Sequence, residues 1–245
     1  AQLFCLVAYA PDESFLKHLA KDVKPGGLMC RAMAAGDIVK TVEILQNNAE
    51  LPMLISANLE KGGDGIATEG TCIGSPMQVA ATDDSEFARR LGHAASIEGS
   101  SVGANWAFSP IVDIDYNFRN PITNTRTFGS DPATVKEFGV EFIKAVQANG
   151  MAASAKHFPG DGIDERYQHL VSTVNDLSCE DWDKSYGEIY KACIGAEVLS
   201  IMAGHIMLPE YSRKLSPGIK DEDILPASLS YELLTGLLRN QLGYN

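Results

Sequence analysis

Short apolar runs alternate with amphipathic helical patterns along almost the whole chain, and this alternation limits the fold more than any other feature. Apolar runs bounded by turn residues are typical of buried strands, and repeated strand–helix units predict a parallel sheet covered by helices. Six such runs occur, at residues 3–9, 27–30, 53–57, 104–112, 151–156 and 198–206. The sequence therefore predicts an α/β fold.

The segments between these runs carry apolar residues at helical spacing, so each would cover the sheet with one face. Asp131 and Pro132 are suited to cap and begin one helix, and Ser178 with Asp181 forms a capping pattern for another. The predicted buried faces consist of Ile38, Val42 and Leu45; Phe87, Leu91 and Ala94; Val135, Phe138, Phe142, Ile143 and Val146; Trp182, Tyr186, Ile189 and Cys193; and Leu233, Leu234, Leu237 and Leu238.

A parallel sheet of this kind is either an open, doubly wound sheet or a closed (β/α)8 TIM-type barrel. A G-x-G-x-x-G fingerprint after the first strand would favour the open sheet, but Ala10, Pro11 and Asp12 stand there. Long polar loops after the third, fourth and fifth strands favour the barrel. The last helix is predicted to end at Gly243. The chain would then cover about six of eight strand–helix units, as a single barrel domain over residues 1–245 that is incomplete at its C-terminal end by about 60 residues.

Charge and cysteine content exclude several classes of function. The net charge of −12 argues against nucleic acid or an anionic membrane surface as a partner. No apolar run approaches the roughly 20 residues of a membrane span. The five cysteines are scattered without a C-x-x-C pair, so neither a disulfide framework nor a zinc site is expected. The first residues read as a strand and not as a secretory signal, but a leader can be removed, so the compartment stays open, as does the oligomeric state.

The most informative motif runs from Lys156 to Gly162, Lys-His-Phe-Pro-Gly-Asp-Gly, and is followed by His169. Residues 151–155 before it are small and apolar, like a buried strand, so Lys156 and His157 lie where that strand ends. The carboxyl ends of the strands are where parallel α/β barrels place their chemistry. The motif therefore marks a candidate active site.

Three further polar residues lie near other predicted strand ends: Asn58 after the third strand, Arg126 after the fourth, and His205 at the end of the sixth. Asn58 and Arg126, together with Lys156 and His157, would form a pocket rich in hydrogen-bond donors. His205 would either line this pocket or support its loop through hydrogen bonds. Such a pocket suits a ligand with several hydroxyls, such as a sugar, or an anion such as phosphate.

Two other kinds of site are less well supported by the pattern. The glycine-rich residues 62–65 could cradle a phosphate, but no Lys-Ser/Thr pair follows them. A metal site could use His157, Asp161, Asp164 and His169, but their spacing fits no common ligand pattern. No metal and no cofactor is therefore expected.

The Lys156 motif, with a histidine thirteen residues after the lysine, resembles the family 3 glycoside hydrolases of the β-N-acetylglucosaminidase branch. The upstream pattern N-P-x-x-x-x-R-x-F-G-x-D-P around Arg126 and the Gly-Gly loop after the third strand resemble the same family. The likeness covers nearly the whole chain in the right order. It implies a (β/α)8 barrel, in agreement with the strand–helix pattern.

The resemblance also implies roles for individual residues. Lys156 and His157 would bind hydroxyls of the sugar in the cleaved subsite, with Arg126 in support. Asn58 stands where the family usually has Asp. His169, on a mobile loop after the fifth strand, would be the general acid/base of a retaining mechanism. The family's nucleophile is an Asp at the end of the seventh strand, which would lie beyond residue 245.

One departure from the family pattern concerns the acid/base. The family's usual dyad is Asp-x-His, but Tyr167 stands two residues before His169. A phenol supplies no negative charge near neutral pH, so the pKa of His169 should be lowered. Asp164 or Glu165 could take over the role of the missing carboxylate.

The implied function is a retaining exo-glycosidase that removes β-linked N-acetylglucosamine, or a similar β-hexose, from small glycans such as peptidoglycan fragments. The alternatives are a phosphorylase of the same family, a β-glucosidase, and an inactive glycan-binding pseudo-enzyme. The β-glucosidases usually take their acid/base, a Glu, from a second domain, so the Lys156 motif with His169 argues against that reading. The expected partner is a carbohydrate.

Overall fold

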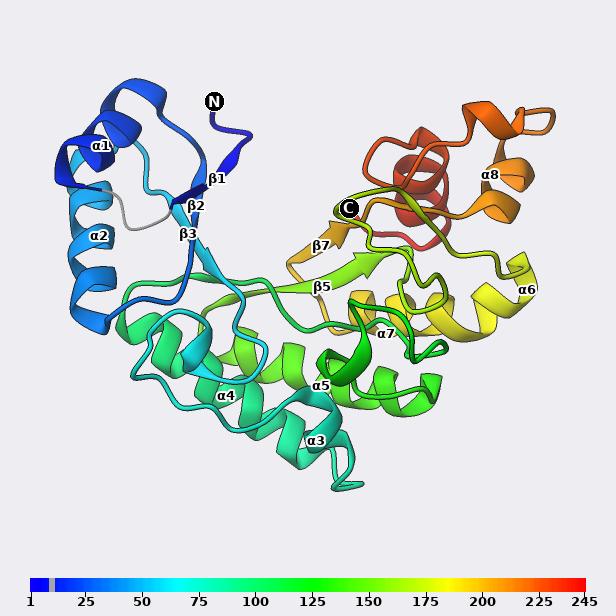
Figure 1. Ribbon diagram of the computed structural model, residues 1–245, viewed down its shortest axis with the longest axis horizontal. Coiled ribbons are helices and arrows are strands. Elements are labelled where there is room, and N and C mark those ends of the chain that lie inside the picture. Colours follow the sequence, from blue (N-terminus) through cyan, green and yellow to red (C-terminus); the bar gives the residue numbers. More distant parts are fainter. Residues whose placement is uncertain (9–11) are drawn as a thin grey trace.

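The computed structural model describes residues 1–8 and 12–245, so the predicted strand residue Tyr9 and the turn residues Ala10 and Pro11 lie outside the described part. Six parallel strands form one curled sheet in the order β1-β2-β3-β4-β5-β7 (Figure 1). Their bounds are β1 Cys5–Ala8, β2 Gly27–Cys30, β3 Leu54–Ala57, β4 Trp106–Ala107, β5 Ala152–Phe158 and β7 Ser200–Ala203. Within this sheet each strand pairs in parallel with the sheet strand that follows it along the chain, which is the arrangement of a (β/α)8 barrel. The predicted fold class is confirmed.

Within the described part of the chain, β1 and β7 are the two edges of this sheet, which is therefore a half-barrel. Apolar side chains are exposed at both edges: Val7 on β1 is 50% exposed, and Leu199 before β7 is 64% exposed. A smaller two-stranded ladder joins β6 (Thr173–Val174) to β8 (Ile206–Met207), so the chain after β5 is tied to the chain after β7.

Helices α2, α4, α5 and α7 follow one another around the outer side of the sheet (Figure 1). The α-helices are α1 Glu13–His18, α2 Ala35–Asn48, α3 Pro76–Ala80, α4 Glu86–Ser101, α5 Pro132–Ala148, α6 Cys179–Trp182, α7 Glu188–Gly195 and α8 Pro209–Leu215. The π-helical segments are η1 Leu19–Val23, η4 Asp183–Gly187 and η6 Glu232–Gln241, and the 3-10 segments are η2 Gly63–Gly65, η3 Asn124–Arg126 and η5 Asp221–Asp223. None of the helices in residues 1–8 and 12–245 combines the length and apolar character that crossing a membrane requires.

The predicted caps are confirmed and one helix face is corrected. Asp131 accepts from the Thr134 amide at the start of α5, and Ser178 accepts from the Asp181 amide at the start of α6. In α4 the buried positions are Ala88, Leu91, Gly92, Ala95, Ser96 and Gly99, whereas Phe87 is 40% exposed. The predicted face of Phe87, Leu91 and Ala94 was therefore rotated by one residue, because α4 packs on α5 through small residues and not through its aromatic one.

Two predicted strands were too long. In the run 104–112 only Trp106–Ala107 forms a regular strand, and after an irregular stretch Ile111 again bridges Lys156 on β5. The run 198–206 is interrupted at residues 204–205, where it leaves β7 for β8. In both places the irregular backbone lies where the strand reaches the loop end of the barrel.

Large aromatic side chains anchor the loop that follows β5. Trp182 and Tyr186 are fully buried, and the Trp182 ring packs edge-to-face on Phe158 with the centroids 6.4 Å apart. The Trp182 indole N–H donates to the Pro159 carbonyl at 2.8 Å, and the Tyr186 hydroxyl donates to the Asp161 carbonyl at 2.6 Å. The hydrophobic core therefore fixes the backbone of the Lys156 motif directly.

Replacing Gly92 with Ala is expected to destabilise the chain. A Cβ at Gly92 would lie 2.7 Å from the Phe142 carbonyl oxygen, so α4 and α5 would have to move apart, at a cost of about 1–3 kcal/mol. Gly36→Ala is the matched control, because no atom lies within 4 Å of its Cβ position and the change should be neutral or stabilise by up to about 1 kcal/mol. Denaturant unfolding of both variants checks this; equal free energies of unfolding would contradict the close α4–α5 contact.

Candidate active site

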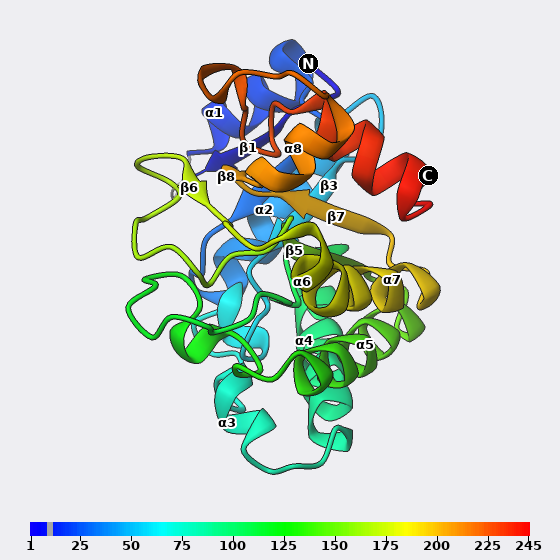
Figure 2. The same ribbon diagram turned by 90° about the vertical axis from the view of Figure 1, so that its right-hand side faces the viewer.

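The loops that leave the carboxyl ends of β4 and β5 lie side by side on one end of the sheet (Figure 2). The Asn117 amide donates to the Gly162 carbonyl at 2.8 Å, and the Asn120 side chain donates to the Asp161 carboxylate at 2.7 Å. These bonds join the loop containing Arg126 to the loop containing the Lys156 motif. The predicted site residues from different strands are thereby brought to a common rim.

Glu60 is the centre of the first charged cluster at this rim. The Lys156 ammonium donates to the Glu60 carboxylate at 2.8 Å and to the Asn58 side-chain oxygen at 3.1 Å. The Arg126 guanidinium binds the same carboxylate through two nitrogens, at 2.8 and 2.9 Å. One carboxylate therefore holds both cations, and it brings Lys156, Arg126 and Asn58 together.

Burial and charge act against each other in this cluster. Burial favours the neutral form of Glu60, but Lys156 and Arg126 outweigh it through their charges and hydrogen bonds and bring the pKa of Glu60 to about 2. Burial lowers the pKa of Lys156, which is 2% exposed, and the neighbouring Glu60 carboxylate opposes that shift. The site thus holds one buried and one partly buried donor, with their counter-charge already in place.

Glu60 was not among the predicted site residues. It stands two positions after Asn58, and residues two apart in an extended segment point to the same side, so Asn58 and Glu60 share a face. That spacing was the only signal in the sequence, and it was weak because the loop holds several other charged residues.

The second cluster is built on Asp113, which is fully buried. Its carboxylate accepts from the His157 ring at Nδ1 (2.7 Å), from the His157 backbone N–H (3.0 Å) and from the Asp161 backbone N–H (2.8 Å). Because a carboxylate needs a donor, Nδ1 carries a proton and Nε2 is left for a ligand. Asp113 therefore sets the orientation and the tautomer of His157.

His169 lies on the loop after β5, with an exposed side chain and its ring edge-to-face with the Tyr167 ring at 4.8 Å between centroids. Burial lowers the pKa of His169, and the positive charges of His157, His205, Arg126 and Lys156 lower it further. The direction agrees with the prediction from Tyr167, but the cause is broader than one missing carboxylate.

The two acids expected to replace the missing carboxylate are both turned toward arginines. Asp164 pairs with Arg166 at 2.5 Å and accepts from the Val174 amide, while Glu165 lies 3.8 Å from Arg119. In the described part of the chain, neither carboxylate contacts the His169 ring. The prediction that Asp164 or Glu165 could serve His169 was therefore wrong, because each has a closer cationic partner.

His205 lies on the segment between β7 and β8 and is held by two hydrogen bonds. Its ring nitrogen Nδ1 lies 2.8 Å from the Ser228 hydroxyl, and its backbone N–H donates to Gln168 at 3.0 Å. The bond to Gln168 places His205 beside the loop that carries His169.

The two alternative sites find no support. Among residues 1–8 and 12–245, no group of three or more His, Cys, Asp or Glu side chains is arranged to hold a metal ion. At the glycine-rich segment 62–65, the Glu98 carboxylate lies 2.1 Å from the Cβ position of Gly63 and accepts from the Thr71 amide. A phosphate there would meet a negative charge.

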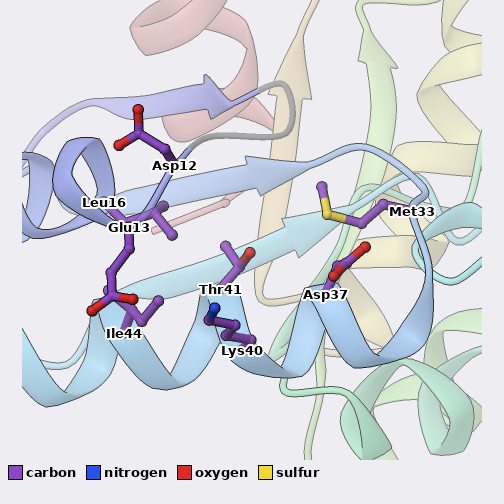
Figure 3. Close-up of a pocket in the computed structure, with 8 residues that line it drawn as sticks. All are labelled: Asp12, Glu13, Leu16, Met33, Asp37, Lys40, Thr41 and Ile44. Carbon is purple, nitrogen blue, oxygen red and sulfur yellow. The ribbon is translucent and has the colours of Figure 1, made fainter.

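A separate cavity of about 320 Å³ lies between α1 and α2 (Figure 3). Its lining includes Asp12, Asp37 and Lys40 but none of the predicted site residues. The Asp12 carboxylate caps α1 by accepting from the Phe15 amide at 2.8 Å. This cavity is distinct from the rim that carries Lys156 and His157.

Fold and rim together define a (β/α)8-barrel protein with a donor-lined site at the carboxyl ends of its strands. The model of the glycosyl hydrolase family 3 N-terminal domain matches residues 14–245. A β-N-acetylglucosaminidase/β-glucosidase of Cellulomonas fimi is 54% identical over 244 residues, which are 100% of this chain and 43% of that protein. A β-hexosaminidase A of Pseudoalteromonas piscicida is 31% identical over 212 residues, 81% of this chain and 34% of that protein.

Solved structures agree with these sequence relatives. The β-glucoside phosphorylase BglX with bound 2FGlc superposes with a TM-score of 0.92 at 42% identity, covering 98% of this chain and 44% of that one. A family 3 β-N-acetylglucosaminidase of Paenibacillus sp. str. FPU-7 gives a TM-score of 0.87 at 27% identity, covering 99% and 46%. This chain belongs to glycoside hydrolase family 3, and it spans less than half the length of these relatives.

Glu60→Gln is expected to destabilise the chain, because Lys156 and Arg126 would lose their counter-charge. A carboxyl pKa lowered from 4.5 to about 2 contributes about 3 kcal/mol above pH 4.5, and this contribution is lost as the pH falls toward 2. The difference in free energy of unfolding between wild type and Glu60→Gln should therefore shrink over that pH range in denaturant titrations.

The matched control is Glu86→Gln. Glu86 also binds two cations, Arg89 and Arg90, but both arginines are exposed and Glu86 itself is less buried than Glu60, so its removal should change stability much less. Equal losses for the two variants, or a loss at Glu60 that does not vary with pH, would contradict the role of buried charge.

Proposed function

We propose that the full-length protein containing this chain is a retaining exo-glycosidase that removes β-linked N-acetylglucosamine, or a similar β-hexose, from small glycans. The observation that carries the proposal is the buried pair Lys156 and His157, each held by its own carboxylate, beside the exposed imidazole of His169. The names of the Cellulomonas fimi and Paenibacillus relatives support the same sugar.

In this proposal Lys156 Nζ and His157 Nε2 bind hydroxyls of the sugar to be released. His169 donates a proton to the glycosidic oxygen as the bond to the anomeric carbon breaks, and later removes a proton from the attacking water. The nucleophile is a carboxylate from outside residues 1–245, which forms and then loses a glycosyl ester. We also infer that residues 1–245 form part of one barrel domain completed by further strands.

Phosphorolysis is the second candidate, because a β-glucoside phosphorylase is 42% identical to this chain. A histidine acid/base carries no negative charge once it has given up its proton, so it does not repel an incoming phosphate as a carboxylate would. In this case phosphate replaces water in the second step, and the product is a sugar phosphate.

His169→Ala is expected to lower kcat on an aryl N-acetyl-β-glucosaminide by about 10²–10⁴-fold in the full-length protein, because proton transfer to the leaving group is lost. His18→Ala, on the exposed face of α1, is the control and should keep wild-type kcat. The rate is measured with and without inorganic phosphate: a phosphate-dependent rate with a sugar phosphate product identifies the phosphorylase. No turnover by wild type under either condition would contradict the proposal and favour a glycan-binding pseudo-enzyme.

Tyr167→Asp is expected to move the alkaline limb of the pH–rate profile to higher pH. Because the pKa of His169 is lowered, its ring loses the proton that it must donate at a lower pH than an ordinary histidine does as the pH rises. A carboxylate two residues away would raise this pKa. Tyr167→Asn is the matched control, because asparagine is nearly the same size as aspartate and carries no charge. If both variants shift the limb equally, charge is not the cause.

A further inference from the structure

Gln168 is a buried residue in an otherwise exposed loop. Between Ile163 and Ser172, all of which the structure describes, Gln168 is the only buried side chain, at 3% exposure. Its neighbours Tyr167 and His169 are both exposed. The residue between the two rings therefore points into the protein while the rings point outward.

Both ends of the Gln168 amide are hydrogen-bonded to different loops. Its Nε2 donates to the Asp161 carboxylate at 2.6 Å, and its Oε1 accepts from the His205 backbone N–H at 3.0 Å. A carboxylate requires a donor and an N–H requires an acceptor, so the orientation of the amide follows from its partners. A Cβ at Gly204 would lie 2.8 Å from Oε1, so the absence of a side chain there leaves room for Gln168.

Asp161 is itself firmly held. Its carboxylate accepts from the Asn120 side chain and from the Gly162 amide, both at 2.7 Å, and its own N–H donates to Asp113. The charged groups that act on Asp161 are Asp113 and His157, and the Tyr186 hydroxyl binds its carbonyl. Gln168 is therefore attached to the same network that orients His157.

We propose that Gln168 is a positioning residue that holds His169 at a fixed place on the barrel rim by fastening its loop to Asp161 and to the segment between β7 and β8. The β6–β8 ladder closes the C-terminal side of the loop, so Gln168 provides the fastening in its middle. This inference rests on the proposed acid/base role of His169. A mobile loop after β5 is expected from the sequence, whereas the bonds of Gln168 imply a loop that is docked before substrate binds.

Gln168→Glu tests the proposal through pH. The new carboxyl would face Asp161 at about the same distance, and two carboxyls so close share a proton that the pair loses as the pH rises. At pH 7.5 they repel each other, so the loop should leave its site. Misplacement of a catalytic group by about 1 Å can cost on the order of 100-fold, so kcat relative to wild type should fall by 10–100-fold at pH 7.5 and recover most of this at pH 5.

Two readouts are compared in the full-length protein: the relative kcat, and the hydrogen exchange of amides 163–172. Exchange should quicken in Gln168→Glu at pH 7.5 and return toward wild type at pH 5. The dissociation constant of the product sugar should change less than kcat, because Lys156 and His157 are untouched. If wild type shows no turnover, the proposed function fails, while hydrogen exchange still reports on the fastening.

Gln147→Glu is the matched control. Gln147 also bonds through both ends of its amide, to the Glu197 carbonyl and the Leu199 amide, but it lies at the end of α5, away from the rim. It should show no pH-dependent change in kcat or in the exchange of residues 163–172. Gln168→Met removes the bonds without adding charge, and should speed exchange at both pH values. Wild-type exchange in Gln168→Met, or wild-type kcat in Gln168→Glu at pH 7.5, would overturn the proposal.

Discussion

The carboxylate of Glu60 is the interaction on which the site depends, because it compensates two neighbouring cations, the buried Lys156 and the partly buried Arg126. Without it, Lys156 would be an ammonium in a low-dielectric environment beside the guanidinium of Arg126, and burial would favour its neutral form. With it, both cations remain charged and fixed before any ligand arrives. The cost of ordering these long side chains is thus met during folding and not during binding.

A second carboxylate, Asp113, plays the corresponding part for His157, and its influence reaches further. It binds the His157 ring and the Asp161 amide, and Asp161 in turn binds Gln168 beside His169. The buried imidazole of His157 and the exposed imidazole of His169 are therefore connected through one chain of buried hydrogen bonds. Parallel strands make this possible, because their carboxyl ends deliver loops that are distant in sequence to a single rim.

Much of the fold and part of the candidate site could be predicted from the sequence, and the predictions that failed or were missed share a cause. Strand–helix alternation predicted the barrel class correctly. Local pattern and family likeness predicted Lys156, His157, Arg126 and Asn58 at strand ends, and their functional roles stay predictions. Glu60 and Gln168 escaped prediction because their roles depend on partners 96 and 37 residues away. The acids expected to support His169 were assigned wrongly for a related reason. Glu165 and Asp164 form ion pairs with Arg119 and Arg166, and spacing along the chain does not reveal which cation a carboxylate will contact.

The most direct test of the account is a crystal structure of the full-length protein with N-acetylglucosamine bound. The account predicts sugar hydroxyls within hydrogen-bonding distance of Lys156 Nζ and His157 Nε2, unchanged Glu60 and Asp113 contacts, and the His169 ring facing the anomeric oxygen. A sugar bound away from Lys156 and His157, or a His169 ring turned from the anomeric oxygen, would contradict it.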